Sequence, residues 1–168
     1  SYATAQGTTA LGERSIASLS GQHAKASGQF SAQGDAQIYD IVLRRSTTTA
    51  TPAVVSSTNS AGTTANQVIL ANNSAVYVRG RIVVRENATG DTASYSFDCL
   101  VKRGANAAAT SIVGSPSVTQ TYADAGATTW IAALSADTTN GGLAVTVTGE
   151  AAHILRWVCH SECVEVRG

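Results

Sequence analysis

The amino-acid sequence predicts an all-β fold: an antiparallel β-sandwich, jelly-roll-like, preceded by a short Gly/Ala/Ser-rich fibrous or β-roll stem. Three observations support this. From residue 38 onward, apolar residues recur at every second position, the period of a half-buried strand. Turn-forming residues separate roughly eight or nine such segments at spacings of about ten residues, as in sandwiches. No helical pattern extends beyond a few residues.

Composition limits the partners that the chain can have. Charged residues make up 13% of the 168 residues, and eleven Lys and Arg balance eleven Asp and Glu. This balance gives no support for a nucleic-acid partner or for an anionic membrane. No apolar run reaches the roughly 18 residues of a membrane span, so we expect no membrane insertion. The sequence has no Met, even at position 1, and we expect it to be the C-terminal part of a longer polypeptide.

Residues 1–35 differ in composition from the sandwich at 36–168 and are predicted to be a small-residue stem or oligomerisation segment. Small residues recur there every seven positions, at Ala10, Ala17, Ala24 and Ser31. A coiled coil needs Leu, Ile or Val at such positions, so we expect a short-turn β-roll or an extended fibrous segment. Such a strip buries little apolar area alone, which indicates a homo-oligomer. A flexible linker is the alternative, against which stand Ile16, Leu19 and Phe30.

Between residues 38 and 103, strands are predicted at 38–45, 53–55, 66–70, 74–85 and 94–103. The residues expected to face inward are Tyr39, Ile41, Leu43, Val76, Val78, Ile82, Val84, Tyr95, Phe97, Cys99 and Val101. Gly80 interrupts the apolar face of 74–85 and suggests a bulge or a bend there. The other face of that strand mostly carries Tyr77, Arg79, Arg81 and Arg85.

Further strands are predicted at 110–113, 117–122 and 128–134. A hairpin follows, with its turn at 137–142 and with Leu143, Val145 and Val147 on one face. A strand at 153–166 closes the sandwich. The two prolines, Pro52 and Pro116, are expected in loops or at strand ends. Three aromatic residues are expected as core anchors: Tyr95, Trp130 and Trp157.

Several segments resemble a known family when they are taken together. They are Gly34–Gln37, Val42–Arg45, Asn72–Tyr77, Gly80–Val84, Lys102–Asn106, Ala136–Gly141 and Arg156–Val158. Over roughly residues 34–166 the chain resembles the C-terminal β-sandwich of bacteriophage tail-fibre and related virion surface proteins. The segments 15–21 and 24–34 resemble the Ala/Ser/Gly repeats of trimeric adhesin heads and phage fibre shafts.

The resemblance implies a homotrimeric fibre tip or spike on the virion surface, on a tail fibre or a head spike, that attaches the particle to its host. We expect a receptor-binding domain whose partners are a host surface glycan or other receptor, with a polysaccharide as the favoured ligand, and other virion proteins on its N-terminal side. Three copies can raise the effective affinity of a weak site by about 10² to 10⁴. The alternative is a structural virion component, a head fibre or capsid decoration domain, that docks onto other virion proteins.

No cofactor, metal site or enzyme activity is expected. The cluster of His153, Cys159, His160, Glu162 and Cys163 contains residue types that bind zinc. On a strand, however, His153, Cys159 and Cys163 share one face and His160 points to the other. A disulfide between Cys99 and Cys159 is geometrically conceivable, although assembly in a reducing cytoplasm would keep both as thiols. The sequence has no nucleophile elbow, catalytic triad pattern or paired carboxylates.

Five residues are the candidates for binding. Tyr77, Arg79 and Arg81 share one strand face that suits an acidic glycan or a partner subunit, a solvated sheet face being the alternative. Tyr122 is the aromatic residue least committed to the core, and Asp124 begins the turn beside it. The candidate binding loops, which are polar and join strands, are 56–65, 86–92 and 123–128.

Overall fold

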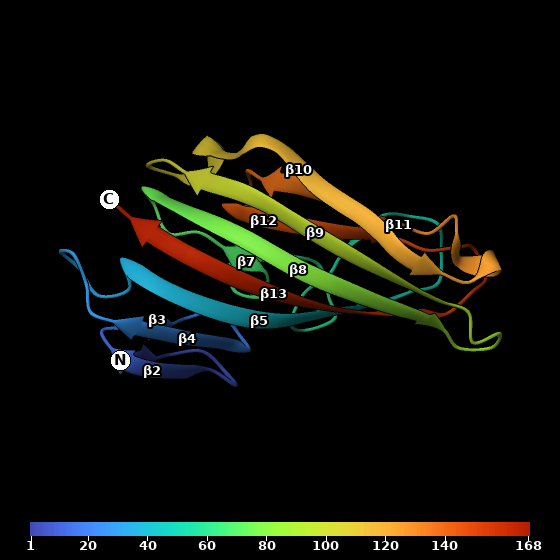
Figure 1. The fold of residues 1–168 in the computed structure, drawn as a ribbon, viewed down its shortest axis with the longest axis horizontal. Helices are drawn as coiled ribbons and strands as arrows, with labels where there is room; N and C mark the ends of the chain where they lie inside the picture. Colours follow the sequence, from blue (N-terminus) through green and yellow to red (C-terminus); the bar gives the residue numbers. More distant parts are fainter.

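The computed structural model describes all of residues 1–168, and its regular structure is almost entirely strand (Figure 1). The strands are β1 (Tyr2–Ala3), β2 (Thr9–Glu13), β3 (Ile16–Ala17), β4 (Gln22–Ser27), β5 (Ala36–Thr47), β6 (Ala53–Val54), β7 (Val68–Ile69), β8 (Ser74–Glu86), β9 (Thr92–Arg103), β10 (Thr110–Ala123), β11 (Ile131–Asp137), β12 (Gly142–Thr148) and β13 (Leu155–Arg167). Two single-turn 3-10 helices are η1 (Ala107–Ala109) and η2 (Ala125–Ala127). No helix is both long and apolar enough to cross a membrane.

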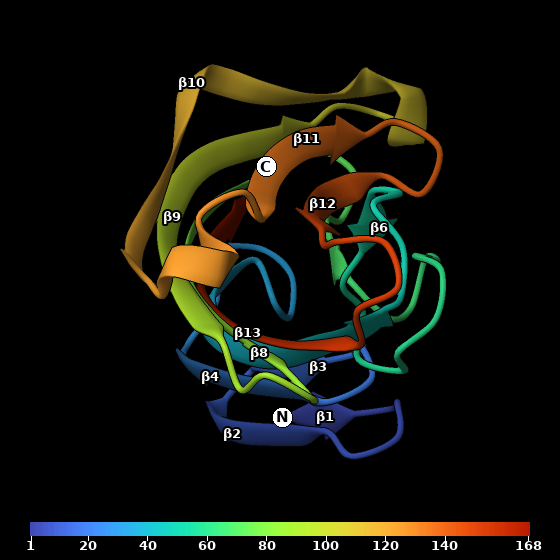
Figure 2. The same cartoon turned by 90° about the vertical axis from the view of Figure 1, so that its right-hand side faces the viewer.

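Two facing sheets enclose the core. The large sheet has the strand order β10-β9-β8-β13-β5-β4-β2, and the small one has the order β11-β12-β6, with β7 also pairing β12. The large sheet curves around the small one (Figure 2). One hydrophobic cluster of 28 buried residues draws on both sheets. The prediction of an all-β sandwich is therefore confirmed.

The inward faces predicted from alternation are those that the structure buries. Every residue predicted to face inward on the strands between 38 and 103 is at most 4% exposed. The hairpin is also confirmed, because β11 and β12 pair antiparallel and Gly141 at their turn has a φ of +80°. Leu143, Val145 and Val147 face the core as expected, and Ala144 is buried as well.

An aromatic cluster occupies the core at one end. The ring centroids of Tyr95 and Trp130 lie 6.2 Å and 6.3 Å from that of Trp157. Each polar atom of the buried rings has a partner: Tyr95 Oη donates to the Trp130 carbonyl at 2.7 Å, and Trp157 Nε1 donates to Thr47 Oγ1 at 3.0 Å. The expectation that these three aromatic residues anchor the core is confirmed.

The segment 110–123 corrects the predicted strand pattern. The two strands predicted at 110–113 and 117–122 are one edge strand, β10, whose register with β9 shifts between Val113 and Ser117. Pro116 lies inside this strand and not in a loop or at a strand end. An edge strand with a local break in pairing accommodates Pro, because no ladder hydrogen bond is lost there. The strand expected at 128–134 is β11, which starts three residues later.

Gly80 corrects a second prediction, because β8 has no bulge or shift there. Its register with β9 runs without interruption through the Gly80–Phe97 pair, and its register with β13 runs through Gly80–Ser161. The glycine instead leaves space for the Phe97 ring, which contacts the position that a Cβ atom would occupy. A glycine opposite an aromatic residue therefore makes room for the ring without interrupting the pairing of the strand.

The last strand of the chain takes the central place in the large sheet. β13 pairs antiparallel with β5 along one side and with β8 along the other, over its whole length. Strands that are far apart in the sequence, 36–47 and 74–86, are therefore joined by the C-terminal segment (Figure 1). The sandwich cannot be completed until this segment is in place.

Residues 1–35 form four strands, of which β2 and β4 extend the large sheet and β1 and β3 pair with each other as a separate two-stranded sheet. β1 pairs parallel with β3 and β2 parallel with β4, in a register where Thr9 lies beside His23. β4 then pairs antiparallel with β5. A side-chain contact also joins the segment to the sandwich: Gln37 Oε1 accepts from the Ile16 amide at 2.9 Å, while Gln37 Nε2 donates to Glu165 within the sandwich at 2.8 Å. Its buried residues Ala17, Leu19 and Ala24 belong to the common core.

Candidate functional site

The outer face of the large sheet carries most of the large apolar side chains that the molecule exposes. Alternation along its strands sends one set of side chains into the core and the other set outward. The continuous antiparallel register then aligns the outward side chains in rows that cross the strands. Two adjacent rows differ sharply in character.

The apolar row is defined by one outward residue on each of the seven strands: Leu11, Lys25, Ile38, Val164, Tyr77, Leu100 and Val113. Its six apolar members are between 39% and 59% exposed. Four further large apolar residues of the same face are similarly exposed: Val42, Val83, Val158 and Val166. A contiguous apolar surface of this kind marks an interaction site in a folded protein.

The charged row lies two residues further along each strand and consists of His23, Asp40, Glu162, Arg79 and Asp98. Glu162 accepts hydrogen bonds from Arg79 at 3.0 Å and from Arg81, which lies on the same strand as Arg79, at 3.1 Å. The hydrogen bond from Arg79 lowers the pKa of the Glu162 carboxyl group, and the same bond raises the pKa of the Arg79 guanidinium group.

Asp40 has no arginine partner in this row. It lies directly beside Glu162 on the neighbouring strand, and like charges in that position repel. Its nearest cationic candidate is the half-exposed His160, whose Nε2 lies 3.6 Å from Asp40 Oδ2. Carboxylates therefore gather on β5 and β13 at this level, while β8 carries two guanidinium groups.

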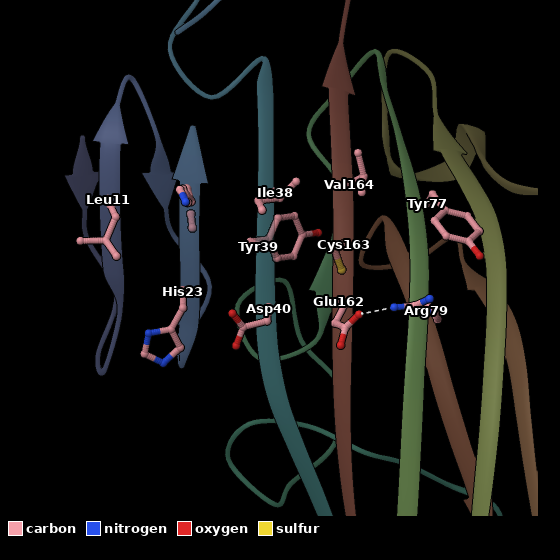
Figure 3. A pocket seen from close by; sticks show the side chains of 12 residues that line it. Leu11, His23, Ile38, Tyr39, Asp40, Tyr77, Arg79, Glu162, Cys163 and Val164 are labelled. Atoms are coloured by element: carbon pink, nitrogen blue, oxygen red, sulfur yellow. Dashed lines mark hydrogen bonds and ion pairs between the residues drawn. The ribbon is translucent and has the colours of Figure 1, made fainter. Parts of the chain in front are cut away.

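A groove of about 460 Å³ runs where the two rows meet. Figure 3 shows its lining side chains on five successive strands, from Leu11 on β2 through His23, Asp40 and Glu162 to Tyr77 on β8. A second groove, of about 450 Å³, continues from Ile38 and Val164 towards Phe30 and Val166. The sandwich and the N-terminal segment therefore share one surface.

Phe30 lies at the end of this surface, on a loop that hydrogen bonds to Asp35 hold in place. Its ring is 76% exposed, yet the buried Asp35 carboxylate accepts hydrogen bonds from the amides of Phe30, Ser31 and Ala32 at 2.9, 2.7 and 2.6 Å. The bond from Ala32 is the main cause of a lowered pKa at Asp35. An exposed aromatic ring on a loop held in this way is preorganised for contact with a partner.

The five predicted binding residues fall into two groups. Tyr77, Arg79 and Arg81 lie together on the outer face, as their shared strand required. Tyr122 and Asp124 lie elsewhere, at the end of β10, which is the end of the molecule away from both termini (Figure 1). The sequence interpretation missed Glu162 and Asp40 as members of the first group, because only the pairing of β13 with β8 and β5 brings them there.

The second group surrounds a shallow pocket of about 280 Å³ that also includes Val83, Thr92 and Ser94. The Tyr122 ring is 77% exposed. Asp124 Oδ2 accepts from the amide and the hydroxyl of Thr92, both at 2.9 Å, which leaves Oδ1 without a hydrogen bond from the protein. An exposed ring therefore lies near a carboxylate held in place by the start of β9.

Two of the three candidate loops share this end. The Asp124 amide donates to the Thr92 carbonyl at 2.9 Å, so loops 86–92 and 123–128 are in contact. Loop 56–65 runs elsewhere and ends against the N-terminal segment, where the Ser20 amide donates to the Ala65 carbonyl at 3.0 Å. Loop 56–65 is therefore not part of the surface around Tyr122.

The cysteine and histidine cluster is dispersed in the structure. Cys159 and Cys163 face the core, and His160 faces outward, as alternation predicted. His153 corrects the prediction, because it precedes β13 and lies 3.8 Å from Glu86 instead of sharing the cysteines' face. All three cysteines are free thiols, so Cys99 and Cys159 are not bridged. No group of three or more His, Cys, Asp or Glu side chains is arranged to hold a metal ion.

Comparison with known proteins finds a distant structural similarity. No protein-family model and no curated protein matches the chain. Among solved structures, it is similar to the tailspike protein of Acinetobacter phage vB_ApiP_P1, with a TM-score of 0.33 and 13% sequence identity. The similarity covers 78% of this chain but 22% of the tailspike. So distant a similarity establishes neither a shared fold nor a shared activity.

Proposed function

We propose that the protein is a non-enzymatic fibre or spike tip of a phage or phage-like particle that binds a host cell-surface polysaccharide as a homotrimer. The observation that carries the binding role is the exposed Tyr122 ring beside Asp124, at the end of the molecule away from both termini. A domain held to a particle through its N-terminal side presents this end to the host. The assignment to a virion draws on the resemblance of residues 34–166 to tail-fibre sandwiches.

The chemistry around Tyr122 suits a sugar. The ring offers an apolar face for stacking on a pyranose, and its hydroxyl is free to bond. Asp124 Oδ1, Thr92 and Ser94 supply acceptors and donors for sugar hydroxyl groups. A pocket this shallow predicts weak binding by one copy, and a trimer compensates by avidity.

Two features support a non-enzymatic role. Asp40 and Glu162 are the carboxylates that converge on the outer face, but the lowered pKa keeps Glu162 ionised, whereas a general acid needs a raised one. The groove that these two groups line is also open to solvent, since the Glu162 side chain is 39% exposed, whereas a catalytic cleft excludes water.

The proposal is tested by solution mass and by binding to an array of bacterial surface polysaccharides. Light scattering of the full chain should give about 51 kDa, three times the 17.1 kDa of one chain. We expect Tyr122→Ser to weaken array binding about tenfold or more, since each 1.4 kcal/mol of lost contact is about a factor of ten. Tyr2→Ser, which changes an exposed tyrosine of the N-terminal segment, is the matched control and should bind normally.

A monomer would contradict the trimer, and equal binding by Tyr122→Ser and the unchanged chain would contradict the assigned site. A trimer that binds no polysaccharide on the array would favour the second candidate function, a head fibre or capsid decoration domain. The extensive apolar outer face is the observation that favours this alternative, because docking onto other virion proteins would cover it.

A further inference from the structure

We propose that the outer face of the large sheet, together with Phe30, is the surface through which copies of this chain associate. The occupant is a second copy of the same chain. The inference rests on the proposed homotrimer and adds the surface that forms it. It also assigns Tyr77, Arg79 and Arg81 to contacts between copies and leaves Tyr122 and Asp124 for the receptor.

The size of the face matches a stable interface. The five long strands β5, β13, β8, β9 and β10 contain 12 to 14 residues each. At about 4.8 Å per strand and about 3.3 Å per residue they span about 24 Å by 40 Å, or roughly 1,000 Å². A specific protein–protein interface covers about 800 Å² on each partner.

The composition of the face is that of an interface and not of a solvated sheet. The solvated face of a sheet carries mostly charged and polar side chains. The apolar row instead places an exposed apolar side chain on six of the seven strands. Phe30 adds a preorganised aromatic ring at one end, held by the three hydrogen bonds to Asp35. Aromatic residues in such positions are typical anchors of interfaces.

The charges of the face favour another copy of the same chain as the occupant. Asp40 on β5 repels the adjacent Glu162 and lacks an arginine partner, while Arg79 and Arg81 of β8 both donate to Glu162 and Arg79 also lies beside Asp98 of β9. A copy that places its β8 flank against the β5 flank of its neighbour supplies the missing cation to Asp40. Contacts between two different flanks of the same face are heterologous, the kind of contact that forms a ring such as a trimer when the rotation between neighbouring copies closes.

The test compares Val164→Asp with Ile131→Asp in the full chain by light scattering. Val164 lies in the centre of the apolar row and is 57% exposed, while Ile131 lies on β11 outside the large sheet and is 54% exposed. A charge at either position is tolerated by a single chain. We expect Val164→Asp to reduce the mass to 17.1 kDa with an unchanged far-ultraviolet circular dichroism spectrum, and Ile131→Asp to keep the mass of the unchanged chain.

A second measurement serves if Val164→Asp does not fold. The three native cysteines are at most 4% exposed, so a cysteine introduced on the surface is the reactive one. Maleimide labelling of Val164→Cys should be about tenfold slower in the oligomer than in protein diluted until it dissociates. Ile131→Cys should label at the same rate in both. Equal rates for Val164→Cys in the two states would overturn the proposal.

The outcomes separate this inference from the proposed function. An oligomer whose mass is unaffected by Val164→Asp overturns the assignment of the face, which then belongs to a different protein, but leaves the trimer standing. A dimer that Val164→Asp dissociates upholds the face and contradicts the trimer. A monomeric unchanged chain contradicts both.

Discussion

Gly80 of β8 lies directly opposite Phe97 of β9, and the Phe97 ring contacts the position where any larger residue would place its Cβ atom. The carbonyl oxygen of His160, on β13, would lie 2.7 Å from that atom. At the centre of the large sheet, the Phe97 ring therefore occupies space that only a glycine at position 80 leaves free.

Gly80→Ala should destabilise the protein by about 1–3 kcal/mol, because added volume in a packed core displaces its neighbours. Urea denaturation measures the free energy of unfolding. Gly28→Ala is the control, because nothing lies within 4 Å of a Cβ atom there and the change should be close to neutral. Combining Gly80→Ala with Phe97→Leu should recover part of the loss and not all of it, since the His160 oxygen remains. An unchanged stability for Gly80→Ala would show that the strands move apart at little cost.

Thr47→Val should destabilise the aromatic cluster by about 1–3 kcal/mol, because it removes the acceptor of the buried Trp157 indole N–H and leaves that donor unsatisfied. Thr47→Ser keeps the hydroxyl group and should lose less. Both are measured by thermal or urea unfolding monitored through tryptophan fluorescence. If Thr47→Ser lost more stability than Thr47→Val, the methyl group and not the hydrogen bond would be the main contribution of position 47.

Acid should destabilise the protein through three carboxylates that organise loops. Asp35, Glu86 and Asp137 each accept backbone amides, and each has a lowered pKa. The main cause is the Ala32 amide at Asp35 and the Thr89 amide at Glu86. At Asp137, burial alone would raise the pKa, but hydrogen bonds from Asn140, Gln67 and Thr139 outweigh it.

Because the folded-state pKa lies below the ordinary values of 3.8 and 4.5, the unfolded chain binds more protons in acid. The stabilisation is fully present above those values and is lost as the pH falls through the folded-state pKa. Urea denaturation from pH 7 to about pH 3 should show this decline. Asp35→Asn should be less stable at neutral pH and should lose less on acidification. Glu13→Gln, at an exposed position, should follow the unchanged chain. The idea fails if Asp35→Asn shows the same acid dependence as the unchanged chain.

The three thiols should be unreactive in the folded protein. Burial raises the pKa of Cys99 to about 11 and that of Cys159 to about 12, and it raises the pKa of Cys163 still further. A thiol reagent at about pH 8 needs the thiolate and access to it, and the native fold supplies neither. We expect no rapid reaction of the native protein with Ellman's reagent and three equivalents after unfolding in guanidinium chloride. One fast thiol in the native state would contradict the buried positions.

On the outer face, the sequence predicts which side chains point outward but not which of them become neighbours. Alternation along β8 correctly separates Val76 and Val78 from Tyr77 and Arg79, because the direction of a side chain on a strand depends only on its own position. The row that joins Tyr77 to Val164 and Ile38 depends on which strands are neighbours and in what register. Even the paired residues of β8 and β13 that are closest in sequence, Glu86 and Leu155, are 69 positions apart, and only packing of the whole core brings β13 between β8 and β5.

The sequence by itself determined the local properties of this protein: its strands, their inward residues, the hairpin at 137–142 and the aromatic residues of the core. These follow from the two-residue period and from turn chemistry, which act over a few neighbouring residues. The tertiary structure alone decided that β13 is central, that Gly80 fits against Phe97, that 110–123 is one edge strand, and that Tyr122 lies far from Tyr77. Each of these depends on long-range register, which is set when buried faces from distant segments pack into one core.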